Sequence, residues 1–294
     1  MTDHEGPEFW LFLPQMRMSL DAMVERAQAA EAAGFKGIAL MDHLAPPLAE
    51  AQPMYEAMTL AMLLLARTER LSVGHLVLCD AMRQPAVLAR EVVTLDHASG
   101  GRFELGLGWG SVPAELELFG VGSSEAKVRV SRMEESLEVM TALWSGEPVT
   151  FEGEHFRLTD AQQQPTPLGH VPITIGGSGK RTLEMVRRHG DWCNLPVNKI
   201  EQADEVRAKV GDARLSTQNR VTYIAPGADR QETEGLARRR FGDTGHLVGD
   251  ADELIAQFRA LHERGIDRFY AWFTDFAKPE TLAGFGSEVI GAFT

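Results

Sequence analysis

The sequence predicts an α/β protein that folds as a (β/α)8 TIM barrel, with a small hairpin inserted between the fourth and fifth β/α units. The first observation behind this prediction is that short apolar runs alternate with segments of helical period along the whole chain. The second is that the alternation repeats eight times, and strands alternating with helices form a parallel sheet that eight repeats can close. The third is length, because 294 residues, 44% of them hydrophobic, suffice for one barrel domain over residues 1–294.

The first four units fill the amino-terminal half of the chain. We predict their strands at residues 9–13, 37–41, 71–78 and 103–107, and their helices at residues 20–33, 55–66, 85–98 and 127–144. The first helix ends at Gly34, since glycine commonly follows the last helical residue. An open doubly wound sheet is the alternative fold, but Pro14, Gln15 and Met16 stand where it would carry a glycine-rich fingerprint.

The alternation breaks and then resumes in the carboxyl-terminal half. Residues 149–158 alternate in polarity around Gly153, which predicts the inserted hairpin. The last four strands are predicted at residues 172–175, 192–195, 220–225 and 268–273, and their helices at residues 181–189, 200–211, 251–265 and 280–293. The unit count therefore reaches eight.

Composition limits the function classes. The 42 acidic residues outnumber the 29 basic ones and give a net charge of −13, so we expect no nucleic-acid partner and no membrane surface, and a small-molecule substrate instead. Cys79 and Cys193 are too few for a disulfide framework, which indicates a cytoplasmic protein. Residues 1–7 do not resemble a signal peptide, and the longest apolar stretch, residues 60–66, is far shorter than the ~20 residues that span a bilayer.

Functional residues of a barrel belong to the loops after its strands. Asp42 and His43 follow the second strand, although a turn cap and an ordinary hydrogen bond would also explain this pair. Gly74 lies within the third strand, where a glycine marks a bulge or a close backbone approach. After the fourth strand, Gly106, Gly108 and Gly110 leave one strand face without side chains, so a flat ring fits there; a glycine turn needed for packing is the alternative.

The fifth strand leads into Gly176, Gly177 and Ser178 directly before a predicted helix. Free backbone amides and the positive end of a helix dipole bind phosphate well, so we predict a phosphate site in this loop. Trp192 in the sixth unit is predicted to lie beside that phosphate, with a packed core tryptophan as the alternative.

The residues that three kinds of TIM-barrel enzyme need for catalysis are missing from the predicted strand ends. None of the nine histidines forms the His-x-His pair of metal-dependent hydrolases, so no metal site is predicted. The strand ends carry no Schiff-base lysine, and the seventh ends in Ala225, Pro226 and Gly227 where a retaining glycosidase needs a carboxylate. Few acid–base groups and one phosphate loop fit an enzyme whose cofactor performs the difficult step.

Together these motifs resemble the luciferase-like monooxygenase superfamily, and most closely its short-chain members that use the deazaflavin coenzyme F420. The resemblance runs nearly end to end. It rests on AEAAGF at residues 30–35, MDHL at 41–44, LDHASGGRFELGLG at 95–108, LWSG at 143–146, VTFEG at 149–153 and ITIGGSG at 173–179.

The resemblance implies a location for each part of the cofactor. Asp42 and His43 would lie beside the ring and assist catalysis, and a bulge of the third strand, sometimes with a non-prolyl cis peptide, would press on its face. The remaining residues that it assigns to cofactor binding are Gly74, His75, Leu76 and Val77 in the bulge, Gly108, Trp109 and Gly110 beside the ring, and Gly176, Gly177 and Ser178 at the phosphate. Some F420-dependent dehydrogenases of the family have a glutamate proton donor near the position of Ser111, which puts a sugar-phosphate dehydrogenase in doubt.

The resulting hypothesis is hydride transfer between F420 and a small organic substrate, with His43 moving a proton. An FMN-dependent monooxygenase fed by a separate reductase is the alternative, and a non-catalytic binding module with its pocket filled by Trp109 is a second. Substrate choice would depend on residues 45–53, residues 112–126 and the hairpin. The resemblance also implies a homodimer, to which residues 55–62 and 87–92 could contribute an apolar face.

Overall fold

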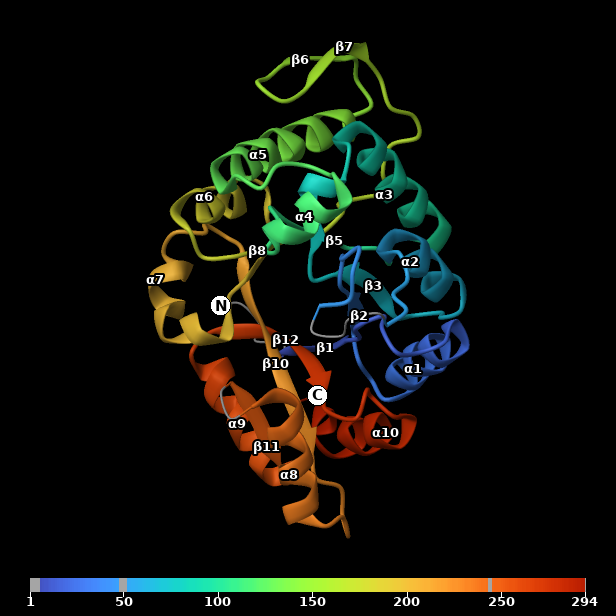
Figure 1. Cartoon of the computed structure of the whole chain (residues 1–294), viewed down its shortest axis with the longest axis vertical. Helices are drawn as coiled ribbons and strands as arrows, with labels where there is room; N and C mark the ends of the chain where they lie inside the picture. The colour runs from blue at the N-terminus through green and yellow to red at the C-terminus, as the bar shows by residue number, and fades with distance from the viewer. Residues whose placement is uncertain (1–5, 48–51, 243–244, 294) are drawn as a thin grey trace.

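The structure, a computed structural model, describes residues 6–47, 52–242 and 245–293 and forms a barrel of parallel strands ringed by helices (Figure 1). Neighbours pair in the order β3-β2-β1-β12-β10-β9-β8-β5-β4, and β11 pairs with β10 outside this path. The strands are β1 (Glu8–Phe12), β2 (Gly37–Leu40), β3 (Ser72–His75), β4 (Leu78–Cys79), β5 (Leu105–Gly108), β8 (Ile173–Gly176), β9 (Trp192–Asn194), β10 (Arg214–Tyr223), β11 (His246–Gly249) and β12 (Ile266–Phe273).

The barrel has eight strand positions, because β3 and β4 are two halves of one interrupted third strand. β3 pairs with β2, β4 pairs with β5, and a bridge between Val73 and Phe103 joins the two sides. The predicted (β/α)8 barrel is therefore confirmed. The inserted hairpin is also present as β6 (Val149–Glu152) and β7 (Arg157–Ala161), which lie outside the helical ring beside α5 (Ala126–Leu143) (Figure 1).

The remaining helices cover the outer face of the sheet. They are α1 (Leu20–Ala32), α2 (Ala57–Ala66), α3 (Pro85–Ser99), α4 (Pro113–Phe119), α6 (Lys180–His189), α7 (Ala203–Arg207), α8 (Arg230–Phe241), α9 (Ala251–Glu263) and α10 (Pro279–Glu288), with 3₁₀ turns η1 (Asp80–Met82), η2 (Val197–Gln202) and η3 (Ile290–Phe293). Over the described ranges, no helix is both long and apolar enough to cross a bilayer.

The elements predicted between residues 200 and 250 differ from the structure in three places. The seventh strand begins at Arg214 and not at residue 220, and α8 and β11 follow it where no element was predicted. Helix α8 has a single buried side chain, Ala237, so the apolar period that reveals a helix is missing. The helix predicted at residues 200–211 is the 3₁₀ turn η2 followed by the short α7.

Alternate residues along β1, β2 and β12 point into the barrel, where they form a small apolar cluster separate from the main core. This cluster contains Trp10, Phe12, Ala39, Met41 and Tyr270. At the amino-terminal end of the strands, Arg268 fills the interior and is only 2% exposed. Its guanidinium donates to Glu8 at 2.7 Å and to Glu104 at 2.6 Å.

Candidate active site

The third strand is interrupted at the barrel mouth. The peptide between Leu76 and Val77 is cis, and it lies between the end of β3 and the start of β4. A Cβ on Gly106 would lie 1.8 Å from the His75 carbonyl oxygen, and one on Gly108 would lie 2.6 Å from the Val77 side chain. The glycines of β5 therefore make room for the bulge, which supports the packing alternative for this strand face.

A hollow of about 320 Å³ opens on the mouth side of this bulge. It is lined by the carboxyl ends of β2, β4, β5 and β8. Among the residues assigned to the site from the sequence, those that line it are Asp42, His43, Leu76, Val77, Gly108, Trp109, Gly110, Gly176 and Gly177. Residues more than a hundred positions apart thus meet at one cavity, because parallel strands place their carboxyl ends on the same side.

The Asp42 carboxylate is buried and hydrogen-bonded to other groups of the protein. It is 6% exposed and accepts hydrogen bonds from the Cys79 amide at 2.9 Å and from Arg83, which also pairs with Glu56 at 2.9 Å. These bonds join the end of β2 to the chain just after the bulge. The geometry therefore indicates a positioning role for Asp42.

The His43 imidazole is held by Glu115, a residue that the sequence analysis missed. Nδ1 of His43 lies 2.9 Å from Oε2 of Glu115, and Oε1 of the same carboxylate accepts the amides of Leu44 at 2.6 Å and Ala45 at 2.9 Å. Glu115 is 7% exposed. A carboxylate only accepts hydrogen bonds, so Nδ1 carries the proton and Nε2 is the lone-pair nitrogen of the neutral ring.

A sequence signal for Glu115 existed. It lies in the stretch 112–126, which was assigned to substrate choice only, and Pro113 just before it is a common first residue of a helix. An acid on a helix that starts directly after the fourth strand must lie at the mouth. Ser111 also lines the hollow.

In the predicted phosphate loop, one of the backbone amides already has a hydrogen-bond partner within the protein. Gly177 adopts φ +127°, a conformation that favours glycine, but its amide donates to the Asn194 carbonyl at 3.1 Å as part of the sheet. The Gly177 amide is therefore not a phosphate donor, contrary to the prediction. Helix α6 begins directly afterwards, and its N-cap residue Gly179 supplies no side-chain cap to the amides of the first turn.

Two bulge residues contribute less than predicted. Gly74 and His75 do not line the hollow. A Cβ on Gly74 would lie 2.9 Å from the Glu104 carbonyl oxygen, so this glycine serves a close approach of strands. His75 is 2% exposed behind the bulge, its ring 5.8 Å from that of Phe103, and burial lowers its pKa to about 4.

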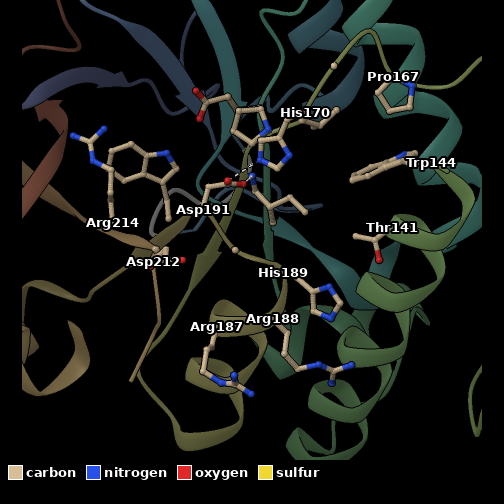
Figure 2. A pocket seen from close by; sticks show the side chains of 18 of the residues that line it. Thr141, Trp144, Pro167, His170, Arg187, Arg188, His189, Asp191, Asp212 and Arg214 are labelled. Carbon is tan, nitrogen blue, oxygen red and sulfur yellow. Dashed lines mark hydrogen bonds and ion pairs between the residues drawn. The ribbon is translucent and has the colours of Figure 1, made fainter. Parts of the chain in front are cut away.

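The prediction for Trp192 was wrong, because this residue begins β9 and lies at the opposite end of the barrel. Its ring packs under Arg268 at 3.8 Å and Arg214 at 4.4 Å. It lines a separate hollow of about 1100 Å³ at the amino ends of the strands. Figure 2 shows His170 and Asp191 of this hollow pointing toward each other, and Nε2 of His170 lies 2.7 Å from Oδ1 of Asp191. Trp192 is a packed tryptophan, as the alternative had it.

Of the segments expected to select substrate, residues 48–51 in the loop 45–53 lie outside the described residues. Residues 112–119 flank the hollow through α4. The hairpin packs on α5, where Glu135 accepts the amides of Glu154, His155 and Phe156, and does not line the hollow.

Comparison with known proteins agrees with this geometry. The luciferase-like monooxygenase family model matches residues 4–215. The F420-dependent glucose-6-phosphate dehydrogenase of Nakamurella multipartita is 35% identical over 263 residues, which cover 89% of this chain and 71% of that protein. The FMNH2-dependent dimethylsulfone monooxygenase of Pseudomonas putida is 28% identical over 286 residues, covering 95% and 69%.

A solved structure gives the same fold. An F420-dependent secondary alcohol dehydrogenase, in complex with an F420-acetone adduct, superposes with a TM-score of 0.79 at 21% identity and covers 97% of this chain and 98% of its own. The family match spans well over half of the sequence, and the dehydrogenase of N. multipartita exceeds 30% identity over most of it. This chain therefore belongs to the luciferase-like monooxygenase family.

Proposed function

We propose that this protein is an F420-dependent oxidoreductase that transfers a hydride between the deazaflavin and a small organic substrate. The observation that carries the proposal is the His43–Glu115 pair, which faces a hollow backed by the interrupted third strand. The relatives named as F420-dependent glucose-6-phosphate dehydrogenases support the choice of cofactor.

The residues around the hollow suit a planar ring with a phosphate tail. Leu76 and Val77 offer an apolar wall, and Gly108 and Gly176 add no side chains to it. Ser178, which follows Gly177 but lines neither hollow at the mouth, and the amides at the start of α6, which have no side-chain cap, would hold the phosphate. A hollow of about 320 Å³ stays open beside Trp109, which speaks against a barrel plugged by its own side chains.

F420, when bound, supplies the hydride chemistry. His43 Nε2 is placed to accept a proton from the substrate's reacting hydroxyl in the oxidising direction and to return it in the reducing direction. Glu115 holds the ring in the required tautomer and stabilises the imidazolium that forms. Asp42, through Cys79 and Arg83, fixes the loop that carries His43.

An FMN-dependent monooxygenase served by a separate reductase is the second candidate, and the similarity to the dimethylsulfone monooxygenases favours it. We also propose that the protein is cytoplasmic, and the two unbridged cysteines support this location.

We further propose a homodimer. An apolar surface on α2 and α3 supports it, and this surface includes Met62 and Val87, whose side chains are 37% and 55% exposed.

Titration with each cofactor tests the proposal. We expect purified protein to quench the fluorescence of F420 saturably and to bind oxidised or reduced FMN at least about tenfold more weakly. Tighter binding of reduced FMN, followed by oxygen consumption, would establish the monooxygenase instead. Binding of neither cofactor would refute both candidates.

A further inference from the structure

A second hollow at the barrel mouth is left without a role by this function. It measures about 530 Å³ and shares Leu76, Val77, Gly176 and Gly177 with the hollow that contains His43. The two spaces therefore form one mouth with the bulge between them. The side chains that distinguish the second hollow are polar: Asn194, Asn198, Gln218 and Arg220.

Arg220 is the charged side chain among the residues that line the second hollow. Its guanidinium donates to the Phe241 carbonyl at 2.6 Å and lies 5.4 Å and 6.0 Å from the rings of Phe241 and Trp272. No carboxylate of the described ranges pairs with it, whereas Arg83 and Arg268 each pair with two. A partly buried charge without a counter-ion is costly unless a ligand supplies one.

None of the described residues that line the second hollow carries a negative charge. His246 is paired with it across β10 and β11, and burial together with the Arg220 charge lowers the pKa of His246. Gln218 and Asn198 are uncharged amides. The buried Oδ1 of Asn194 has no hydrogen-bond donor, so the hollow also offers an acceptor to a hydroxyl group.

The position of Arg220 sets what it can reach. Strand β10 is the seventh position of the eight-strand barrel and the interrupted strand is the third, so the two face each other across the mouth. A flat ring on the bulge would have its free face toward Arg220, with His43 at the neighbouring strand end.

We propose that Arg220 anchors an oxyanion of the substrate, a phosphate or carboxylate, while the reacting carbon lies near His43. The inference deepens the proposed function, on which it rests. The substrate class is a small hydroxylated or carbonyl compound that bears an acidic group at the end remote from the reacting carbon. Paired N–H groups of an arginine suit such an oxyanion better than a lysine would.

Binding of inorganic phosphate tests the anchor. Calorimetry at constant ionic strength, with cofactor-free and with F420-loaded protein, should show saturable binding to the wild type. Arg220→Gln should weaken phosphate binding at least about tenfold, since a charge-assisted contact is lost, and Arg220→Lys should retain part of it. Arg240→Gln is the matched control, because Arg240 also donates to a carbonyl and lies 5.2 Å from an aromatic ring, that of Phe276, but lines neither hollow.

The fluorescence Kd for F420 separates the sources of the oxyanion. We expect it to stay within about twofold of the wild type in Arg220→Gln. If F420 affinity falls together with phosphate affinity, and phosphate competes with F420, the residue holds the cofactor's own phosphate and the proposal is overturned.

Two further results would also overturn the proposal: unchanged phosphate affinity in Arg220→Gln, and no saturable phosphate binding to the wild type. The titration of the wild type tests the proposal even if the Arg220→Gln variant does not fold. Failure of the wild type to bind F420 would refute the proposed function, while the cofactor-free titrations would still decide the anchor.

Discussion

At the scale of single residues, the chemistry depends on a contact between positions 72 residues apart, His43 and Glu115. Glu115→Gln keeps an oxygen near Nδ1 but removes the charge that stabilises the imidazolium. We expect kcat to fall about tenfold to a hundredfold, with the Kd for F420 unchanged. The pH–rate profile should also move, which loss of a merely structural contact would not cause.

The exposed Glu117 on the same helix provides the control for this change. Glu117→Gln should leave kcat and the pH–rate profile as they are in the wild type. If Glu115→Gln has the wild-type profile too, His43 does not depend on a charged partner and its proposed role as proton acceptor loses its support.

A second residue-scale prediction concerns Gly177. A side chain there must adopt φ +127°, and its Cβ would lie 3.2 Å from the Thr182 methyl group in the first turn of α6. Gly177→Val should therefore displace the start of α6 and weaken F420 binding at least about tenfold. Gly169→Ala, with nothing within 4 Å of the added Cβ, should leave the Kd unchanged. An unaltered Kd in Gly177→Val would move the phosphate away from α6.

At the scale of elements, local patterns predicted every strand position of the barrel, because strands buried on both faces read as short apolar runs between helices. They failed for α8, whose exposed sequence carries no apolar stripe, and for Trp192, where the strand was found but the end of it was misjudged. As the first residue of β9, Trp192 lies at the amino end of the barrel. Deciding this needs the strand boundary to within about two residues, which sequence patterns do not provide.

The same limit explains what was missed in the site. Asp42, His43 and the phosphate loop follow strands directly and could be found by position along the chain. The roles of Glu115 and Arg220 depend on contacts with residues far away in the sequence, and those contacts form only when the barrel closes. The Gly177 amide is a similar case, since its pairing with the Asn194 carbonyl depends on the register of β8 with β9.

At the scale of the whole molecule, the fold buries a neutral histidine whose protonation opposes folding. Burial lowers the pKa of His75 to about 4 from an ordinary value of 6.5, although the nearby Asp42 and Glu56 raise it and Arg83 lowers it further. Below pH 6.5 the His75 imidazole binds a proton in the unfolded chain but stays neutral in the folded chain until the pH approaches 4. Stability from His75 is therefore complete above pH 6.5 and is lost as the pH falls toward 4.

This difference should appear as a slope of the unfolding free energy against pH. Between pH 6.5 and 4.5 the slope should be about 1 kcal/mol per pH unit steeper in the wild type than in His75→Gln, as measured by urea denaturation. Glu56 does not titrate in this window: burial alone would raise its pKa, but hydrogen bonds from Thr59 and Met58 and the Arg83 charge lower it to about 2. The exposed His97 serves as the control, and His97→Gln should keep the wild-type slope. Equal slopes in wild type and His75→Gln would mean that the folded protein accommodates the imidazolium, and that the segment behind the bulge opens to water at mildly acidic pH.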